Sequence, residues 1–439
     1  MASIEHLQVP DQKRCCLDNL APEIIDHILF QMDSVRALGN LITVSHFIHR
    51  CFQRRKEQVI LCVLQNELGL IMADAKILSV FPYRYPSHDP RADAVILRTM
   101  LDRRRSGAPF SYAELMGLCA TLHQINFLTD AYVTMHKFSI GADGPFAAPL
   151  SRVERLRVQR AFYRRQIICN AWAPTERGPQ CILSTSFNRR AQSTGTRAGA
   201  EQVAISALCY WELQQVDHVD HFISRLCKAL CLARDEHAGR ASWTENRRGP
   251  GVGRRLNEAE FGRLYSHGDR LVQYMRAYPS IANAALQAVP WLPWLRSREF
   301  AGDEPAYNHF AERYSLTCHR VPYQHHRLNG LPEHERNHKQ VHFSGDAVRL
   351  PPFGWVDALD GRHVYWFGEG LRCLSQDSEL DDKMVPLERH EPLEIWRGAG
   401  FALWDQGRVE AIKALDYFRD LQTGWLINST VGEITDGDG

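Results

Sequence analysis

The feature that most constrains this chain is a compact block of three apolar segments near its N-terminus, residues 17–52. Pro22 stands where a first helix would begin, and Asp33-Ser34 separates that helix from the next. Apolar residues recur at helical spacing in each segment: Ile24, Ile25, Ile28, Leu29 and Met32; then Val35, Leu38 and Leu41; then Val44, Phe47, Ile48, Cys51 and Phe52. The pattern predicts three short helices. Such a small block buries little surface alone and usually needs a partner surface.

Longer helices are predicted for residues 53–289, which we interpret as a helical domain after an N-terminal extension (1–16) and the three-helix block (17–52). A helix from about Gln53 to Leu68 is expected to end at Gly69. Capping boxes, in which Ser precedes Glu by three residues, predict two further helix starts at Ser111 and Ser151. Helices are also expected over about 203–235 and 257–277. The stretches 188–200 and 238–255 lack apolar periodicity and are predicted to be flexible loops.

The C-terminal part, residues 290–431, differs in composition, because tryptophans cluster there with many prolines. It is expected to be a smaller mixed α+β region. Its tryptophans are expected to be core residues: Trp291, Trp294, Trp355, Trp366, Trp396 and Trp404. Residues 355–367 are predicted to form a β-hairpin around Asp360-Gly361, because that dipeptide suits a type I′ turn. A last helix is predicted over about 407–421, followed by a disordered acidic tail, 432–439. The predicted fold class is therefore mainly α.

Charge and apolar patterning favour a soluble protein with no nucleic acid or membrane partner. The chain has 52 Lys and Arg against 51 Asp and Glu, so its total charge offers no general attraction to anionic partners. Its longest unbroken apolar run, Val59–Leu64, is far shorter than the ~20 residues that cross a bilayer. The 12 cysteines include no CxxC pair and suit buried thiols in a reducing compartment. We therefore expect a cytoplasmic or nuclear protein.

One set of residues in the N-terminal block has a recognisable order: Leu20-Ala21-Pro22-Glu23-Ile24-Ile25, Ile28-Leu29, Asp33-Ser34, Leu38, Leu41 and Val44-Ser45. In this order the block resembles the F-box. Further strings lie along the chain: Arg54-Arg55-Lys56-Glu57, Leu64-Gln65-Asn66-Glu67-Leu68-Gly69, Glu154-Arg155-Leu156-Arg157, Gln159-Arg160-Ala161 and Gly400-Phe401-Ala402-Leu403-Trp404-Asp405 before Arg408. With these strings the wider chain resembles a large group of uncharacterised fungal proteins with F-box-like N-termini.

The resemblance implies an interaction and not a reaction. In the F-box family the three-helix block packs on a Skp-type linker subunit of an SCF (cullin-RING) ubiquitin ligase, and the rest of the chain captures a substrate protein. The positions that match the family's anchors are Leu20, Pro22, Ile24, Ile28, Leu38, Leu41 and Val44. The expected function is thus a non-catalytic adaptor without a cofactor. The first alternative is an F-box-like interaction protein whose block recruits no ligase.

A second alternative is a zinc-dependent hydrolase. His334-Glu335-Arg336-Asn337-His338 matches the HExxH pattern, in which two His one helical turn apart bind zinc and the Glu acts as general base. The inner residues of such helices are usually uncharged, whereas Arg336 occupies one of them here. The sequence therefore favours a polar surface segment, and we predict no metal site.

The segment after Ser151 is unusually rich in arginine: Arg152, Arg155, Arg157, Arg160, Arg164 and Arg165. A basic helix of this kind can bind RNA or phosphate. The apolar side formed by Val153, Leu156, Tyr163 and Ile167 favours instead an amphipathic helix whose charge is balanced by acidic neighbours elsewhere in the chain.

Overall fold

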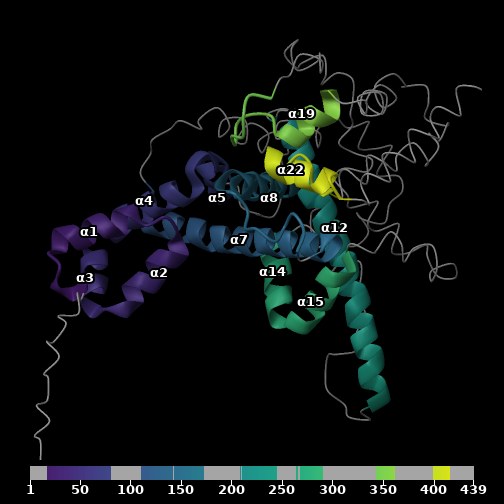
Figure 1. Cartoon of the computed structure of the whole chain (residues 1–439). Coiled ribbons are helices and arrows are strands. Elements are labelled where there is room, and N and C mark those ends of the chain that lie inside the picture. Colours follow the sequence, from purple (N-terminus) through teal and green to yellow (C-terminus); the bar gives the residue numbers. More distant parts are fainter. Residues whose placement is uncertain are drawn as a thin grey trace, which may run out of the picture. The chain divides into compact units, whose positions relative to one another are not determined.

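The structure, a computed structural model, describes residues 17–80, 110–141, 143–172, 208, 210–244, 264, 267–289, 343–360 and 399–415. The described residues contain helices and no strands, which confirms the mainly α prediction (Figure 1). The chain divides into two compact units. Unit 1 comprises residues 1–72 and 107–120, and unit 2 comprises residues 73–106 and 121–439.

Unit 1 contains the three predicted short helices, α1 (Pro22–Gln31), α2 (Val35–Val44) and α3 (His46–Arg54). They follow the 3-10 turn η1 (Leu17–Asn19) and precede α4 (Lys56–Leu68) and η2 (Gly69–Ile71). Ser34 caps α2 by accepting a hydrogen bond from the Ala37 N–H, as its place in the sequence predicted. Gly69 ends α4 with a φ of +49°, a conformation that glycine adopts without the steric cost of a Cβ.

The core of unit 1 lies among α1, α2, α3 and α4. The side chains that these helices and η2 bury are apolar: Ile25, Leu29, Leu38, Ile48, Cys51, Phe52, Val59, Ile60, Val63, Leu64, Leu68 and Ile71. α4 contacts each of the three preceding helices, so the packed unit continues past residue 52, where the sequence suggested a boundary.

Two polar side chains of α4 form hydrogen bonds with the turn between α1 and α2. The Asn66 side-chain amide donates to the carbonyl oxygens of Phe30 and Met32, both at 3.0 Å. The Glu67 carboxylate accepts from the Val35 N–H at 2.7 Å, at the start of α2. These bonds satisfy backbone groups that a helix end leaves without partners. They also place a negative charge at a helix N-terminus, where the helix dipole favours it.

Unit 2 is built from longer helices, α7 (Tyr112–Ile140, which begins in unit 1), α8 (Arg152–Trp172) and α12 (Tyr210–Thr244). Shorter helices complete it: α5 (Met72–Val80), α14 (Gly268–Ala277), α15 (Pro279–Ala288), α19 (Phe353–Asp360) and α22 (Gln406–Lys413). α12 packs against both α8 and α15, and α19 packs against α22. Parts of the chain on both sides of residue 290, where the sequence suggested a boundary, thus belong to one unit.

Both predicted capping boxes are present. The Glu114 carboxylate accepts from the Ser111 N–H at 2.7 Å, and the Ser111 hydroxyl accepts from the Glu114 N–H at 3.3 Å. Ser151 and Glu154 make the same reciprocal pair at 2.8 and 3.1 Å. The starts of α7 and α8 were therefore predicted correctly, because each depends on four consecutive residues.

Three local expectations need correction. Residues 355–360, expected to begin a β-hairpin, lie in α19, whose Trp355 and Val356 face the core. Residues 238–244, expected to lie in a loop, continue α12 to Thr244. Residues 56–79 form a helical stretch long and apolar enough to cross a membrane, although half of its most apolar window is buried inside the protein. Core helices have the same length and composition.

Other predictions fall outside the described residues. These are the extension 1–16 and the tail 432–439, the loop 188–200, the remainder of the loop 238–255 and of the hairpin, the HExxH segment, and four of the six C-terminal tryptophans. The two tryptophans that are described, Trp355 and Trp404, are buried core residues as predicted.

Candidate functional site

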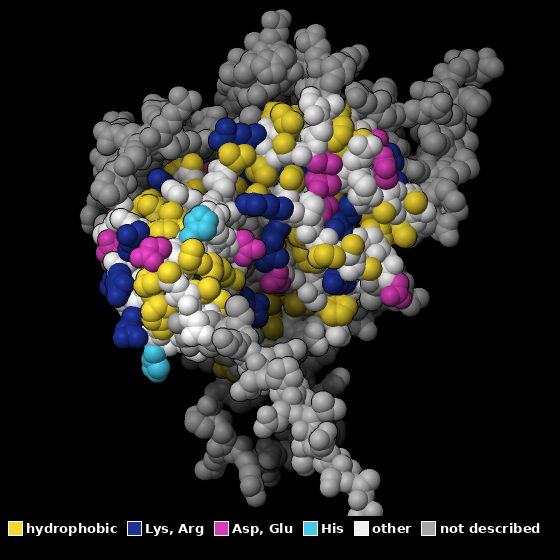
Figure 2. Space-filling model, turned by 60° about the vertical axis from the view of Figure 1, so that its left-hand side comes forward, with side chains coloured by type: hydrophobic (Ala, Val, Ile, Leu, Met, Phe, Trp, Pro, Cys, Tyr) yellow, Lys and Arg dark blue, Asp and Glu magenta, His cyan; other side chains and the backbone are white. Residues whose placement is uncertain are grey.

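The seven anchor positions of the N-terminal block differ in how far they reach solvent. Ile24 is 50% exposed and Val44 is 74% exposed. Leu20, Pro22, Ile28 and Leu41 are half-buried. Figure 2 turns this side of the molecule forward and shows hydrophobic side chains over much of the face, between scattered charged ones. Most of the anchors therefore keep apolar surface in solvent.

Leu38 is the exception. It is only 3% exposed and belongs to the core of unit 1. We predicted it as a partner contact, but its position on the inner face of α2 directs it toward the other helices of the block. This correction removes Leu38 from the candidate site, because a side chain enclosed by its own unit offers no surface to another protein.

Helix α1 carries two apolar stripes. Ile25 and Leu29, four residues apart, are 1% and 0% exposed and form the stripe that packs into unit 1. Ile24 and Ile28, also four residues apart, form the adjacent stripe, which stays partly in solvent. The core of unit 1 thus uses only one of them. A helix with a partly exposed apolar stripe beside a buried one is expected to pack on its own unit with one stripe and to contact another molecule with the other.

A second concentration of functional groups lies in unit 2, around the arginines of α8. Four of them are buried: Arg157, Arg160, Arg164 and Arg165. An amphipathic helix would place these four arginines on a polar outer face, so that part of the prediction is wrong for them, whereas the predicted balance by acidic neighbours agrees with their ion pairs. The helix is buried on nearly all sides, and each buried arginine has a carboxylate or amide partner from elsewhere in the chain.

The carboxylates closest to Arg164 and Arg165 lie on two other helices, α5 and α12. Arg165 Nε donates to Asp220 Oδ1 at 2.8 Å, and the two side chains are 3% and 0% exposed. Arg164 lies 2.8 Å from Glu212 and 3.3 Å from Asp74. Burial lowers the pKa of Arg164, but these two carboxylates outweigh that effect and raise it. Both the pairing and the shift keep the guanidinium charged inside the protein.

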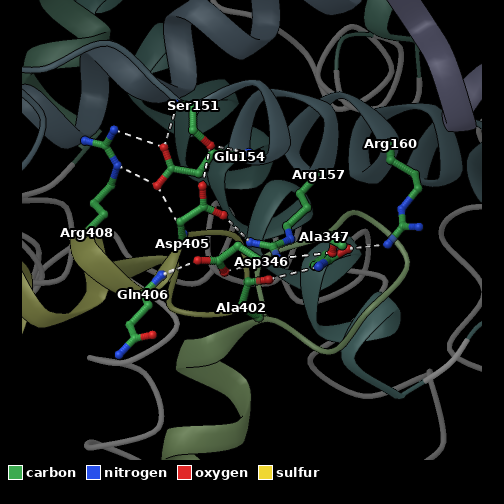
Figure 3. A network of polar contacts seen from close by, with 11 residues as sticks. Ser151, Glu154, Arg157, Arg160, Asp346, Ala347, Ala402, Asp405, Gln406 and Arg408 are labelled. Atoms are coloured by element: carbon green, nitrogen blue, oxygen red, sulfur yellow. Dashed lines mark hydrogen bonds and ion pairs between the residues drawn. The ribbon is translucent and has the colours of Figure 1, made fainter. Parts of the chain in front are cut away.

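Figure 3 shows the part of this network that joins α8 to the segment before α22. Arg157 Nη1 donates to Asp405 Oδ1 at 2.8 Å, and Glu154 pairs with Arg408 through two bonds of 2.8 and 3.0 Å. The Asp405 N–H also donates to Glu154 at 3.1 Å. Burial raises the pKa of Asp405, and the negative charges of Glu154 and Asp346 raise it further. The hydrogen bond from Ser151 and the charge of Arg157 act in the opposite direction, but the net shift is upward.

Two strings that the resemblance singled out in the sequence, residues 154–161 and 400–408, therefore meet in the structure. Gln215 of α12 adds a further bond to this meeting point, from its side-chain amide to the Ala402 carbonyl oxygen at 3.0 Å. The sequence marked both strings but gave no sign that they contact each other.

An aromatic cluster lies within the same unit. The His136 ring stacks on Phe146 with centroids 4.9 Å apart, and Tyr132 and Trp404 meet it edge-on at 4.6 and 5.3 Å. Neither ring nitrogen of His136 has a hydrogen-bond partner among the described residues. Burial, with a smaller contribution from the Arg408 charge, lowers the pKa of His136 to about 3. The imidazole is thus neutral and serves as packing.

The described residues include no group of three or more His, Cys, Asp or Glu side chains that fits a metal ion. His334, Glu335 and His338 lie outside the described residues, so the zinc alternative has no geometry to support it. Burial raises the pKa of the thiols of Cys119 and Cys169 to about 11, which disfavours the reactive thiolate.

Among the described residues, the outer apolar stripe of α1 with Val44 is therefore the feature best suited to contact another molecule. Comparison of the chain with protein-family models, with curated proteins and with solved structures found no match.

Proposed function

We propose that the protein is an adaptor whose N-terminal three-helix block docks onto a Skp-type linker subunit of an SCF ubiquitin ligase. The rest of the chain would then present a substrate protein. The proposal combines the resemblance of residues 17–52 to the F-box with the exposed apolar surface of α1 and α2.

One observation carries the proposal: α1 has a second apolar stripe that its own unit does not bury. Removing a fully exposed Ile or Val side chain from water contributes ~1.5–3 kcal/mol. Ile24 and Val44 are 50% and 74% exposed, so a large part of this free energy is gained only when a partner covers them. A helix that presents such residues beside a packed stripe suits docking into a groove of another protein.

The surface also argues against the alternative in which the block is simply part of the chain's own core. In that case, the residues that match the F-box anchors would be enclosed. Leu38 meets this description, but Ile24 and Val44 do not. The exposure of these two residues therefore supports a docking block over a purely structural one.

The test is co-purification of the full chain with a recombinant Skp-type subunit, using Ile24→Asp combined with Val44→Asp. We expect the double variant to lose binding by at least ~100-fold, because two apolar contacts would become two buried carboxylates without partners. Circular dichroism should show an unchanged helix content, since both positions are exposed.

A matched control is available in the same unit. Leu70 and Met116 are 48% and 45% exposed but lie outside α1, α2 and α3. Leu70→Asp combined with Met116→Asp makes the same chemical change and should leave binding within about twofold. Failure of the intact chain to bind any Skp-type subunit would reject the ligase role and favour an interaction protein that recruits no ligase.

A further inference from the structure

The aromatic cluster of unit 2 encloses the imidazole of His136. The side chain is 0% exposed, and among the described residues neither ring nitrogen has a hydrogen-bond partner. The groups around it are the rings of Tyr132, Phe146 and Trp404. A neutral imidazole packs well in such a place, whereas an imidazolium ion would lose its hydration without gaining a partner.

The charge that acts on His136 is positive. The Arg408 guanidinium lies 5.1 Å from the centroid of Phe146, the ring on which His136 stacks. Glu154 is bound to Arg408 through bonds of 2.8 and 3.0 Å (Figure 3). A proton on His136 would therefore add a second cation beside Phe146, while the Glu154 carboxylate is already paired. The repulsion from Arg408 adds to the effect of burial and disfavours the charged imidazole.

One side of the imidazole is covered by the turn 399–404. Trp404 of this turn contacts His136 edge-on, is 0% exposed and donates its indole N–H to the Ala399 carbonyl oxygen at 2.7 Å. Gly400 lies so close to α7 that an added Cβ would be 2.8 Å from the Tyr132 hydroxyl. Moving the turn away from α7 therefore separates Trp404 from His136 and lets water reach the ring.

Other titratable groups face the turn or the cluster. Burial raises the pKa of Tyr132, which therefore stays neutral in acid. Burial also raises the pKa of Asp405, next to the turn, so its protonation favours the closed turn and partly opposes opening. His218 of α12 is 2% exposed and lies edge-on to Phe401 at 5.2 Å. Tyr132 and Asp405 thus do not drive an opening in acid, which leaves the two imidazoles to be compared by experiment.

We infer that the turn 399–404 is an acid-sensitive switch, which opens when the imidazole of His136 meets water and takes up a proton. The closed turn holds a neutral ring among aromatic side chains and the open turn allows a charged one, so proton uptake and opening are linked. Local opening of this kind needs no unfolding of the whole unit. The switch belongs to unit 2 and is independent of the proposed docking by unit 1.

The size of the effect follows from the proton affinity of His136 in the two states. Its pKa is about 3 in the closed cluster and 6.5 in water. Each pH unit below 6.5 therefore favours the open turn by about tenfold. From pH 7 to pH 5 the ratio of open to closed turns should rise about 25-fold.

The experiment measures amide hydrogen exchange of the full chain by mass spectrometry at pH 7, 6 and 5, with each rate divided by the intrinsic exchange rate at that pH. We expect the corrected exchange of the turn 399–404 to rise about 25-fold from pH 7 to pH 5. The internal reference is the stretch 226–230 of α12 in the same unit, which carries the buried Leu226, Cys227 and Leu230. Its exchange should rise much less.

Two substitutions remove the titrating ring. His136→Phe keeps an aromatic ring that can stack on Phe146, and His136→Leu is a smaller apolar replacement in case the larger ring overpacks the site. In both variants, we expect the exchange of the turn 399–404 to change by less than about twofold between pH 7 and pH 5. The matched control is His27→Phe, the same substitution at an exposed histidine of α1, and it should keep the full rise.

Three results would overturn the inference. An unchanged exchange of the turn in the intact chain between pH 7 and pH 5 would show that the turn stays closed in acid. An equal rise in the stretch 226–230 would mean that unit 2 unfolds as a whole. Both of these comparisons use the intact chain and need no variant. A rise that persists in both His136 variants would assign the proton to another group, such as His218.

Discussion

The two units place their polar and apolar side chains in opposite ways. Every buried polar or charged side chain among the described residues belongs to unit 2, from Asp74 to Ser224, and none belongs to unit 1. Conversely, eight large hydrophobic side chains are exposed in the described part of the chain, and six of them belong to unit 1: Leu17, Ile24, Val44, Leu70, Tyr112 and Met116. Unit 2 encloses charge, and unit 1 leaves apolar surface outside.

The difference has a physical consequence for each unit. Buried ion pairs contribute little net stability, because removing two charges from water offsets much of their attraction, but they tie particular residues together. Unit 2 uses them to join α8 to α12 and to the segment before α22. Exposed apolar side chains gain free energy only when something covers them. Unit 1 therefore keeps apolar surface that a partner could cover, and unit 2 holds its helices together partly through buried ion pairs.

The largest effect should come from breaking a buried pair in unit 2. Arg165→Met removes the cation that lies 2.8 Å from the fully buried Asp220 and should lower the free energy of unfolding by about 3–5 kcal/mol. Arg155→Met is the control on the same helix, because its partner Asp130 is 65% exposed. It should change stability by less than ~1 kcal/mol. Denaturant unfolding measures both variants. Equal losses in the two would contradict the view that burial gives the α8 pairs their importance.

A smaller loss is expected from Gly400→Ala. Gly400 has a φ of +73°, and an added Cβ would lie 2.8 Å from the Tyr132 hydroxyl and 2.9 Å from Trp404 Nε1. Backbone strain and overpacking together should cost about 2–4 kcal/mol. Gly69→Ala, in unit 1, has a φ of +49° but meets no atom within 4 Å, so strain alone should cost about 1–2 kcal/mol. Thermal unfolding should rank the two variants in this order, and the reverse ranking would show that the aromatic cluster is loosely packed.

The buried histidine of unit 2 makes stability depend on pH. The pKa of His136 falls from its ordinary 6.5 to about 3 on folding, so below pH 6.5 the unfolded chain binds a proton that the folded chain does not. Stability is therefore lost as the pH falls from 6.5 toward 3, with a slope approaching ~1.4 kcal/mol per pH unit. Between pH 6.5 and 5 the loss should reach about 2 kcal/mol. Chemical denaturation of His136→Phe should show a flatter profile over that window, and an unchanged profile would place the responsible proton elsewhere.

The smallest effect on stability is expected in unit 1. Ile24→Asp combined with Val44→Asp should change the free energy of unfolding by no more than ~0.5 kcal/mol per site, because both side chains are already exposed. Denaturant unfolding of the isolated full chain is the measurement. A loss of several kcal/mol would mean that these residues support the fold, and would remove the contrast between the two units.

Much of the helical layout could be predicted from the sequence. Caps and stops depend on a few neighbouring residues, so the starts of α2, α7 and α8 and the end of α4 were correct. The predicted β-hairpin was wrong over residues 355–360, because Asp360-Gly361 indicates a turn but not the structure that precedes it. There, packing of Trp355 and Val356 into the core accompanies a helix. Six of the seven predicted anchor positions keep some exposure, whereas Leu38 is buried, because an apolar residue at helical spacing does not reveal which stripe the core will use.

By itself, the sequence determined where the short helices of the N-terminal block lie and that they carry more apolar residues than one small core needs. That information is local and is read from spacing and capping. Only the tertiary structure decided that the arginines of α8 point inward. Their partners lie far along the chain, with Asp220 55 residues from Arg165 and Asp405 248 residues from Arg157. A charge is stable inside the protein only where an oppositely charged side chain packs beside it, and no local sequence pattern predicts a partner so far along the chain.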